Sequence, residues 1–136
     1  MHSLRQRINA RDESGFTLIE LLVVLIIIGV LLAIAVPSYL GFKDRAEAKA
    51  AAADVRSAIP DAEAYFSDVG NYTNMTATSG DAPDATGLKG IDSGLSDAVT
   101  VGASTATTYC LEATVGTHTS HVNGPGGSVA PDNGGC

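Results

Sequence analysis

The sequence lacks tryptophan, and aromatic residues make up only 5% of its 136 residues. It has no internal repeat of solenoid length and no collagen-like glycine repeat, although 15 residues are glycine. Basic residues are also scarce, since eight Lys and Arg stand against 15 Asp and Glu for a net charge of −7. This acidic balance argues against strong direct nucleic-acid binding. The length fits one domain, or one small domain with an appendage.

Signatures of catalytic and metal chemistry are missing as well. Gly124–Gly127 lacks the Lys-Ser/Thr of a phosphate-binding loop, and no nucleophile elbow or catalytic triad signature occurs. No common zinc spacing relates the two cysteines and two of the histidines: Cys110, His118, His121 and Cys136. Four aspartates lack the spacing of a calcium loop and are interpreted as a solvated acidic loop: Asp81, Asp84, Asp92 and Asp97. We therefore expect no enzyme activity, no cofactor and no metal site.

One apolar segment dominates the chain. Residues 16–37 carry a single charge, Glu20, and 13 of the residues in Leu21–Val36 are Leu, Ile or Val. As a helix, the run from Phe16 to Val36 spans about 31 Å, the thickness of the hydrocarbon layer. Insertion of these side chains contributes about −4 to −8 kcal/mol, and Glu20 opposes it by at most about 3 kcal/mol. We therefore expect a membrane-spanning helix.

The charge distribution orients this helix. Residues 1–15 carry a net charge of +1, and residues 64–136 carry −6. A positive flank before an apolar run predicts the N-terminus inside the cell and the acidic C-terminal part outside.

Three interpretations of the apolar segment are open. The first is a cleaved secretory signal, with an A-x-A site at residues 33–35. The second is a plain single-span anchor, which leaves the Glu20 carboxylate without a partner. The third depends on the residues that surround Glu20.

Gly15–Glu20 (GFTLIE) and the apolar run that follows it resemble the prepilin signature of type IV pilins and type II secretion pseudopilins. That signature has a short basic leader, a glycine, an aromatic residue, a glutamate four residues later and an uncharged apolar helix. The resemblance is strong over residues 9–66. It implies that a prepilin peptidase cuts between Gly15 and Phe16 and N-methylates Phe16. Removing the leader would leave 121 residues with a net charge of −8.

The resemblance also implies roles for residues inside the helix. Glu20 would neutralise the new ammonium of Phe16, in its own subunit or a neighbouring one, and so set the register of subunits in a filament. The alternative is a carboxylate that reaches the lipid headgroups. Gly29 and Pro37 lie where many family members loosen the helix, and we expect a kink or an unwound stretch between them in the filament. A simple proline kink without a role in assembly is the alternative.

Residues 38–69 predict an amphipathic continuation of the helix, ending near Asp68 with a cap at residues 70–71. The apolar stripe that we expect to face the head comprises Tyr39, Phe42, Ala46, Ala50, Ala53, Ile59, Ala62, Phe66 and Val69. The opposite, polar face comprises Lys43, Asp44, Glu47, Asp54, Arg56 and Asp61. Lys43 and Glu47 are spaced to form a weak ion pair. Pro60 predicts a bend or a restart of the helix.

The remaining residues, 70–136, predict a small head. Its expected elements are a short helix over residues 86–97, a strand over 108–115, a turn at 116–117, a second strand over 118–122 and a third short strand around Val129. The expected fold class is α+β, with a long N-terminal helix packed on a small antiparallel sheet. This layout is similar to that of a type IV pilin head.

Cys110 and Cys136 are the only cysteines. Because the head is expected outside the cell, we expect them to form a disulfide worth about 3–4 kcal/mol. It would pin a C-terminal segment that includes His118, His121 and Asp132, as in the disulfide-bounded region of many type IV pilins.

The sequence is therefore interpreted as a structural subunit in four parts: leader (1–15), membrane and filament-core helix (16–37), amphipathic helix (38–69) and head (70–136). By resemblance, it starts as a single-pass protein of the cytoplasmic membrane and ends in an extracellular type IV pilus filament. The implied partners are copies of itself, the prepilin peptidase, the pilus assembly platform with its ATPase, and the membrane before assembly. The alternatives are a major pseudopilin of type II secretion, a competence pilin, or a monomeric membrane-anchored binding module.

Overall fold

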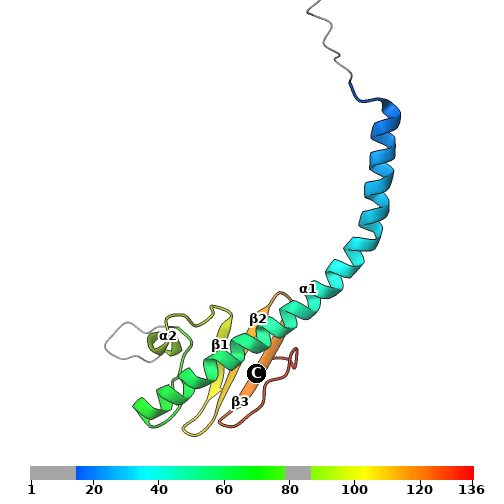
Figure 1. Cartoon of the computed structure of the whole chain (residues 1–136). Helices are drawn as coiled ribbons and strands as arrows, with labels where there is room; N and C mark the ends of the chain where they lie inside the picture. The colour runs from blue at the N-terminus through cyan, green and yellow to red at the C-terminus, as the bar shows by residue number, and fades with distance from the viewer. Residues whose placement is uncertain (1–14, 79–86) are drawn as a thin grey trace, which may run out of the picture. The chain divides into compact units, whose positions relative to one another are not determined.

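The computed structural model describes residues 15–78 and 87–136 (Figure 1). In chain order, its elements are α1 (Leu18–Val69), α2 (Leu88–Ile91), β1 (Val99–Ser104), β2 (Tyr109–Val115) and β3 (His118–Gly124). The chain divides into two compact units, one ending at Tyr39 and the other running from Leu40 to Cys136. Because α1 contributes to both units, its two parts are described separately.

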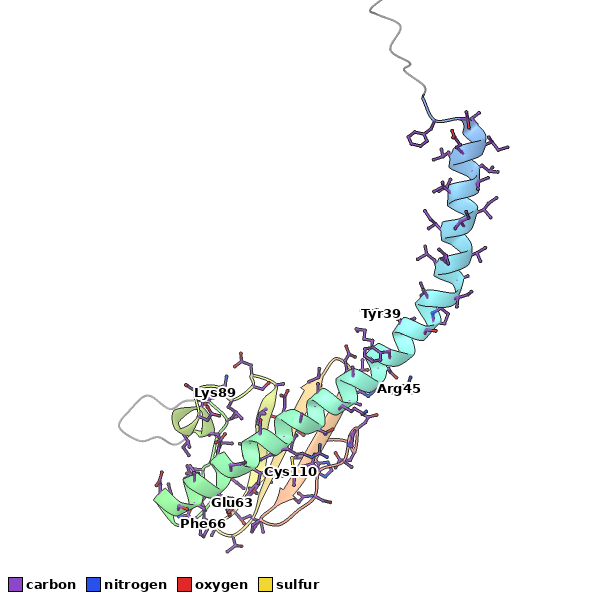
Figure 2. All side chains as sticks on the ribbon, in the orientation of Figure 1. Tyr39, Arg45, Glu63, Phe66, Lys89 and Cys110 are labelled. Atoms are coloured by element: carbon purple, nitrogen blue, oxygen red, sulfur yellow. A yellow bond between two sulfur atoms is a disulfide. The ribbon has the colours of Figure 1, made fainter. Side chains whose placement is uncertain are left out.

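The first unit contains the apolar part of α1. Its side chains project on all sides of the helix, and no described residue covers them (Figure 2). The large aliphatic residues from Ile19 to Val36 are each 46–69% exposed. An 18-residue window of this helix is long and apolar enough to cross a membrane. A helix that is apolar on every side needs apolar surroundings, either lipid or other helices.

The second unit is a three-stranded antiparallel sheet, in the order β1-β2-β3, with the second part of α1 lying across it (Figure 1). The tight turn at residues 116–117 joins β2 to β3 and places Val115 opposite His118. Gly116 has φ +63°, a conformation that glycine adopts easily in such hairpin turns. The strands predicted over residues 108–115 and 118–122 are therefore present, and β3 extends to Gly124.

The core lies between α1 and the sheet. From the sheet, Tyr109, Leu111, Ala113 and Val122 are buried, and the first three are alternate residues of β2. Alanines dominate the helix side of this contact, so the backbone of α1 approaches the sheet closely. Among the described residues, the larger side chains of the core are three tyrosines, three leucines and one methionine.

The face of α1 that the sheet covers differs from the predicted stripe. The residues buried on the helix are Ala51, Ala52, Val55, Ala58, Asp61, Ala62 and Tyr65. From the predicted stripe, only Ala62 is buried and Ile59 is partly buried. The other members are exposed: Tyr39, Phe42, Ala46, Ala50, Ala53, Phe66 and Val69. Alanines occur on every side of this helix. Apolar residues spaced three or four apart can therefore be found along more than one face, and the sequence alone does not show which face is buried.

Asp61 was predicted on the solvent-facing side, and this prediction was wrong. The residue is 8% exposed, and its Oδ2 atom has no hydrogen-bond partner within the described residues. Burial and the nearby charge of Asp92 raise the pKa of the Asp61 carboxyl. The second unit thus contains a carboxylate whose charge is poorly compensated.

The C-terminal end of α1 was predicted correctly from the sequence, whereas the restart predicted at Pro60 was not. The helix continues through Pro60, so the predicted restart does not occur. It ends where Gly70 adopts φ +81° and donates its N–H to the carbonyl oxygen of Phe66 at 2.7 Å. This is the glycine cap that the sequence predicted. Lys43 and Glu47 form the predicted ion pair at 2.9 Å.

Two predictions for the head were wrong. The helix expected over residues 86–97 is limited, in the described part of that range, to the four residues of α2. The third strand is β1, and the segment around Val129 is not a strand. The carbonyl of Val129 accepts a hydrogen bond from the Arg56 guanidinium at 2.7 Å, so α1 rather than a strand holds this segment.

Candidate functional site

The start of α1 carries the residues that the sequence singled out for processing. Gly15, Phe16 and Thr17 are exposed, have no regular secondary structure and immediately precede the helix. The Phe16 side chain is 92% exposed. The Gly15–Phe16 peptide bond is therefore open to solvent and free of helical hydrogen bonding.

Thr17 and Glu20 begin the helix together. The backbone N–H and the hydroxyl of Thr17 each donate to Oε2 of Glu20 at 2.9 Å, and the N–H of Glu20 donates to the Thr17 hydroxyl oxygen at 3.2 Å. This reciprocal pattern is a capping box, with Thr17 as the N-cap and Glu20 three residues later. The sequence analysis missed it, although Thr-x-x-Glu before an apolar run is its signature.

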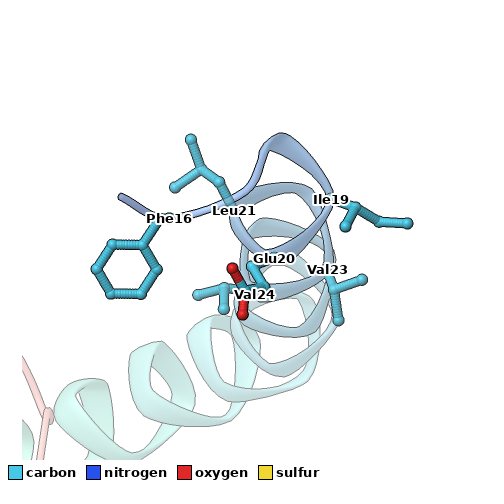
Figure 3. Close-up of a pocket in the computed structure, with 6 residues that line it drawn as sticks. All are labelled: Phe16, Ile19, Glu20, Leu21, Val23 and Val24. Carbon is cyan, nitrogen blue, oxygen red and sulfur yellow. The ribbon is translucent and has the colours of Figure 1, made fainter. Parts of the chain in front are cut away.

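A hollow at this helix start is lined by Phe16, Glu20 and four aliphatic residues: Ile19, Leu21, Val23 and Val24 (Figure 3). Only one oxygen of Glu20 is used by the cap. Both donors from Thr17 reach Oε2, and Oε1 accepts no hydrogen bond from any described residue. The site therefore presents one free carboxylate oxygen within an apolar surface.

Gly29 and Pro37 both lie within α1, which is assigned as helix through both positions. No atom lies within 4 Å of the position that a Cβ would take at Gly29. A loosened helix between these residues in a filament remains a prediction.

The C-terminal segment is held against β3 and β2. Cys110 and Cys136 form a disulfide with a Cα–Cα distance of 6.0 Å, as the sequence predicted. The N–H of Cys136 donates to Oε2 of Glu112 at 2.7 Å. The Asn133 side chain accepts from the N–H of His121 and donates to its carbonyl, at 2.8 and 3.0 Å. The last residues thus pass from β3 to β2, where the disulfide fixes Cys136.

His118 joins three parts of the second unit. Its Nε2 lies 3.0 Å from Oδ1 of Asp44 on α1, and its Nδ1 lies 3.1 Å from Oδ2 of Asp132 in the C-terminal segment. The two carboxylates, Asp44 first, raise the pKa of the His118 imidazole. Asp44 is far from His118 in the sequence, so no local signal could reveal this contact.

Glu63 on α1 anchors two tyrosines that the sequence analysis did not single out. Tyr72 and Tyr109 donate their hydroxyls to its two carboxylate oxygens, each at 3.0 Å. Burial, together with the Glu63 carboxylate, raises the pKa of Tyr72 to about 12. The two rings pack 4.7 Å apart. This cluster fixes the far end of the helix on the sheet and has no group poised for catalysis.

The candidate metal ligands have other partners. Both cysteines are consumed by the disulfide, and His121 Nδ1 lies 3.0 Å from the carbonyl of Gly134. Asp92 accepts from the N–H of Gly94, and Asp97 pairs with Lys89. Asp81 and Asp84 lie outside the described residues. Over residues 15–78 and 87–136, no group of three or more His, Cys, Asp or Glu side chains is placed to hold a metal ion.

The chain is similar to one family model and to several known proteins. A family model described as the prokaryotic N-terminal methylation motif matches residues 10–36. The type IV wide pilus major component PilA4 of Thermus thermophilus is 33% identical over 101 residues, which cover 74% of this chain and 72% of that protein. The type IV major pilin protein PilA of Myxococcus xanthus is 36% identical over 78 residues, which cover 57% of this chain and 35% of that protein.

A third relative is a protein of a type II secretion system. Core protein G of the type II secretion system of Aeromonas hydrophila is 42% identical over 45 residues, which cover 33% of this chain and 32% of that protein. The chain thus spans about a third of the length of the Myxococcus and Aeromonas relatives. No solved structure matches the chain significantly.

Proposed function

Because this chain belongs to the family of type IV pilins and type II secretion pseudopilins, whose members are structural subunits and not enzymes, we propose that it is a type IV pilin. It is cut after Gly15, methylated at Phe16 and polymerised through α1 into an extracellular filament. The observation that carries this proposal is the helix start itself. An exposed peptide bond precedes a helix that is apolar on every side and carries one carboxylate.

Processing suits the local geometry. A protease needs an extended, accessible substrate, and Gly15 adds no side chain that would block the approach. The bond lies before the first helical residue, Leu18, so cleavage leaves the hydrogen bonds of α1 intact. The leader peptidase acts on the cytoplasmic side, because the basic leader stays inside.

Cleavage gives Glu20 a second partner. The new ammonium forms at Phe16, one residue before Thr17. Oε2 of Glu20 continues to cap the helix, and the free Oε1 accepts the ammonium of the same or a neighbouring subunit. Inside a filament an unpaired carboxylate or ammonium is costly, so only subunits in register satisfy both charges.

The apolar part of α1 serves two surroundings in turn. Before assembly it lies in the cytoplasmic membrane as a single span, and after assembly it packs against copies of itself. Both surroundings are apolar, so the transfer costs little free energy of burial. An assembly platform with its ATPase supplies the work of extraction.

A pilus is favoured over the alternatives. The Thermus pilus component aligns over most of this chain, and the Aeromonas secretion protein aligns over a third of it. The disulfide-pinned C-terminal segment also fits a pilin exposed outside the cell. A mature charge of −8 disfavours direct binding of DNA by a competence pilin.

The experiment that tests the proposal distinguishes two roles of Glu20, helix capping and pairing with an ammonium. Glu20→Gln keeps a side chain that completes a capping box but removes the charge. We expect the variant to be inserted and processed normally. The yield of sheared filaments should fall at least tenfold, because an uncompensated buried charge costs about 3–5 kcal/mol. Filament yield is measured by immunoblotting the sheared fraction against the processed pool left in the membrane.

The matched control is Thr17→Ser, which keeps the cap hydroxyl and the charge of Glu20, and which should assemble normally. Normal filaments from Glu20→Gln would limit Glu20 to its capping role. Membrane-bound, uncut protein in wild-type cells would instead support the monomeric anchored module.

A further inference from the structure

The side of α1 that faces away from the sheet is uncovered within the described residues. Phe42 is 67% exposed, and Ala46, Ala50, Ala53 and Ser57 follow it at helical spacing, all exposed. A hollow on this face is lined by Phe42, Ala46 and two cations, Arg45 and Lys49. This is an apolar helix surface with a positive rim.

These two cations differ from the others in the second unit. Lys43 and Lys89 form ion pairs with Glu47 and Asp97, and Arg56 donates to the carbonyl of Val129. Among the described residues, Arg45 donates only to a carbonyl on its own helix, that of Gly41, through Nε. The Lys49 ammonium has no partner in the described part of the chain. Arg45 and Lys49, one helical turn apart, therefore form a cationic pair without a counter-charge.

An unpaired anion lies toward the other end of the same face. Asp68 is exposed, has no partner within the described residues and continues the outward row through Ser57 and Ala64. Asp68 lies 19 residues beyond Lys49, which is about 28 Å along a helix rising about 1.5 Å per residue. The two charges cannot meet within one copy.

We propose that this face of α1 receives a second copy of the chain, with the Asp68 carboxylate of one copy bound between Arg45 and Lys49 of the next. The proposal rests on the proposed function, because it specifies a contact within the filament. A second copy fits this face because each copy carries both the cations, Arg45 and Lys49, and the anion, Asp68.

The orientation of the copies follows from the membrane. Both enter with their N-termini on the same side, so they lie parallel. Side by side at equal height, parallel copies would place Lys49 beside Lys49 and Asp68 beside Asp68, which is repulsive. An axial offset of about 28 Å brings opposite charges together. Such a contact joins two different patches, so it repeats without closing and builds an open helical filament.

The direct test is zero-length carbodiimide cross-linking of sheared wild-type filaments, followed by peptide mass spectrometry. We expect an amide between Lys49 and Asp68 and a ladder of multimers on a denaturing gel. Because the two residues are too far apart on one helix, this link can form only between copies. Lys49→Arg keeps the charge but cannot react, so its filaments should form normally and lack the link.

Charge reversal adds a second, independent measurement. Lys49→Asp and Asp68→Lys should each lower filament yield about tenfold or more. The double variant should restore part of the yield, because the exchanged pair is attractive again while Arg45 still repels the introduced lysine. Lys43→Asp makes the same charge change on the same helix, outside the proposed contact, and should assemble.

The outcomes separate the two proposals. Filaments that form but link Lys49 elsewhere, or a double reversal without rescue, would overturn the contact and leave the pilin function standing. Cross-linking that stops at dimers would overturn the offset arrangement. If wild-type cells make no filaments, both proposals fail.

Discussion

The two carboxylate oxygens of Glu20 are used differently in the structure. Oε2 satisfies the N–H and hydroxyl of Thr17, and Oε1 remains available. A carboxylate at the third helical position also interacts favourably with the helix dipole. The cap thus holds the charge of Glu20 at the helix start, and in the proposed filament the Phe16 ammonium would compensate it. This explains why the helix carries this charge at its start and no other charge up to Pro37.

His118 predicts a pH dependence of the stability of the second unit. Its pKa is raised by Asp44 and Asp132, so the folded state binds the proton more tightly than the unfolded state does. The resulting stabilisation is fully present below the unfolded pKa of about 6.5 and is lost as the pH rises through the folded value. The melting temperature of the full chain in detergent should therefore fall as the pH rises above about 6.5 and through the raised pKa of His118.

The matched variants for this prediction are His118→Gln and His121→Gln. His118→Gln should be less stable than the wild type at low pH, and its melting temperature should fall much less as the pH rises. His121→Gln should retain the fall, because the Asp44 and Asp132 contacts remain. An unchanged profile in His118→Gln would show that the two ion pairs do not contribute.

At the scale of elements, the regular features of α1 and the β2–β3 hairpin were predictable. The apolar run, the Gly70 cap and the alternation in β2 are each local signals with one physical interpretation. The covered face of α1 was not predictable, because its alanines provide no contrast between core and surface. The sheet selects one face through Val55 and Tyr65, and this choice depends on contacts distant in sequence.

The missed strand has a similar cause. β1 is short, contains Gly102 and shows no clean alternation. It becomes a strand because β2 offers an unpaired edge, with Val99 opposite Ala113. The His118 contacts were hidden for the same reason, since Asp44 lies on the helix. The capping box of the candidate site was readable from the sequence but overlooked. The processing roles of Gly15 and Phe16 stay predictions.

Removal of the disulfide should destabilise the head strongly. The Cys110→Ser, Cys136→Ser double variant loses the cross-link between β2 and the last residue. We expect the free energy of unfolding to fall by about 3–4 kcal/mol, because the unfolded chain regains the freedom of a long loop. Denaturant unfolding of the full chain in detergent measures the change.

The wild-type chain treated with a reductant is the control for the disulfide, and it should approach the double variant. An unchanged unfolding midpoint would mean that the hydrogen bonds of Asn133 and Cys136 alone hold the C-terminal segment.

At the scale of the whole molecule, each part of the chain matches a different surrounding. Residues 16–36 are apolar on every side, which suits lipid and a filament core. The head is acidic and cross-linked, which suits exposure outside the cell. In the proposed assembly, such a subunit would pass from membrane to filament without refolding its head, once the leader has been removed.

Leader removal is tested most directly by the intact mass and N-terminal sequence of protein sheared from the cell surface. We predict a chain of 121 residues that begins at Phe16 and carries the added mass of one methyl group. A chain beginning at Met1 would mean an uncut anchor, and one beginning at Val36 would mean an ordinary secreted domain. Either result would contradict assembly through a processed N-terminal helix.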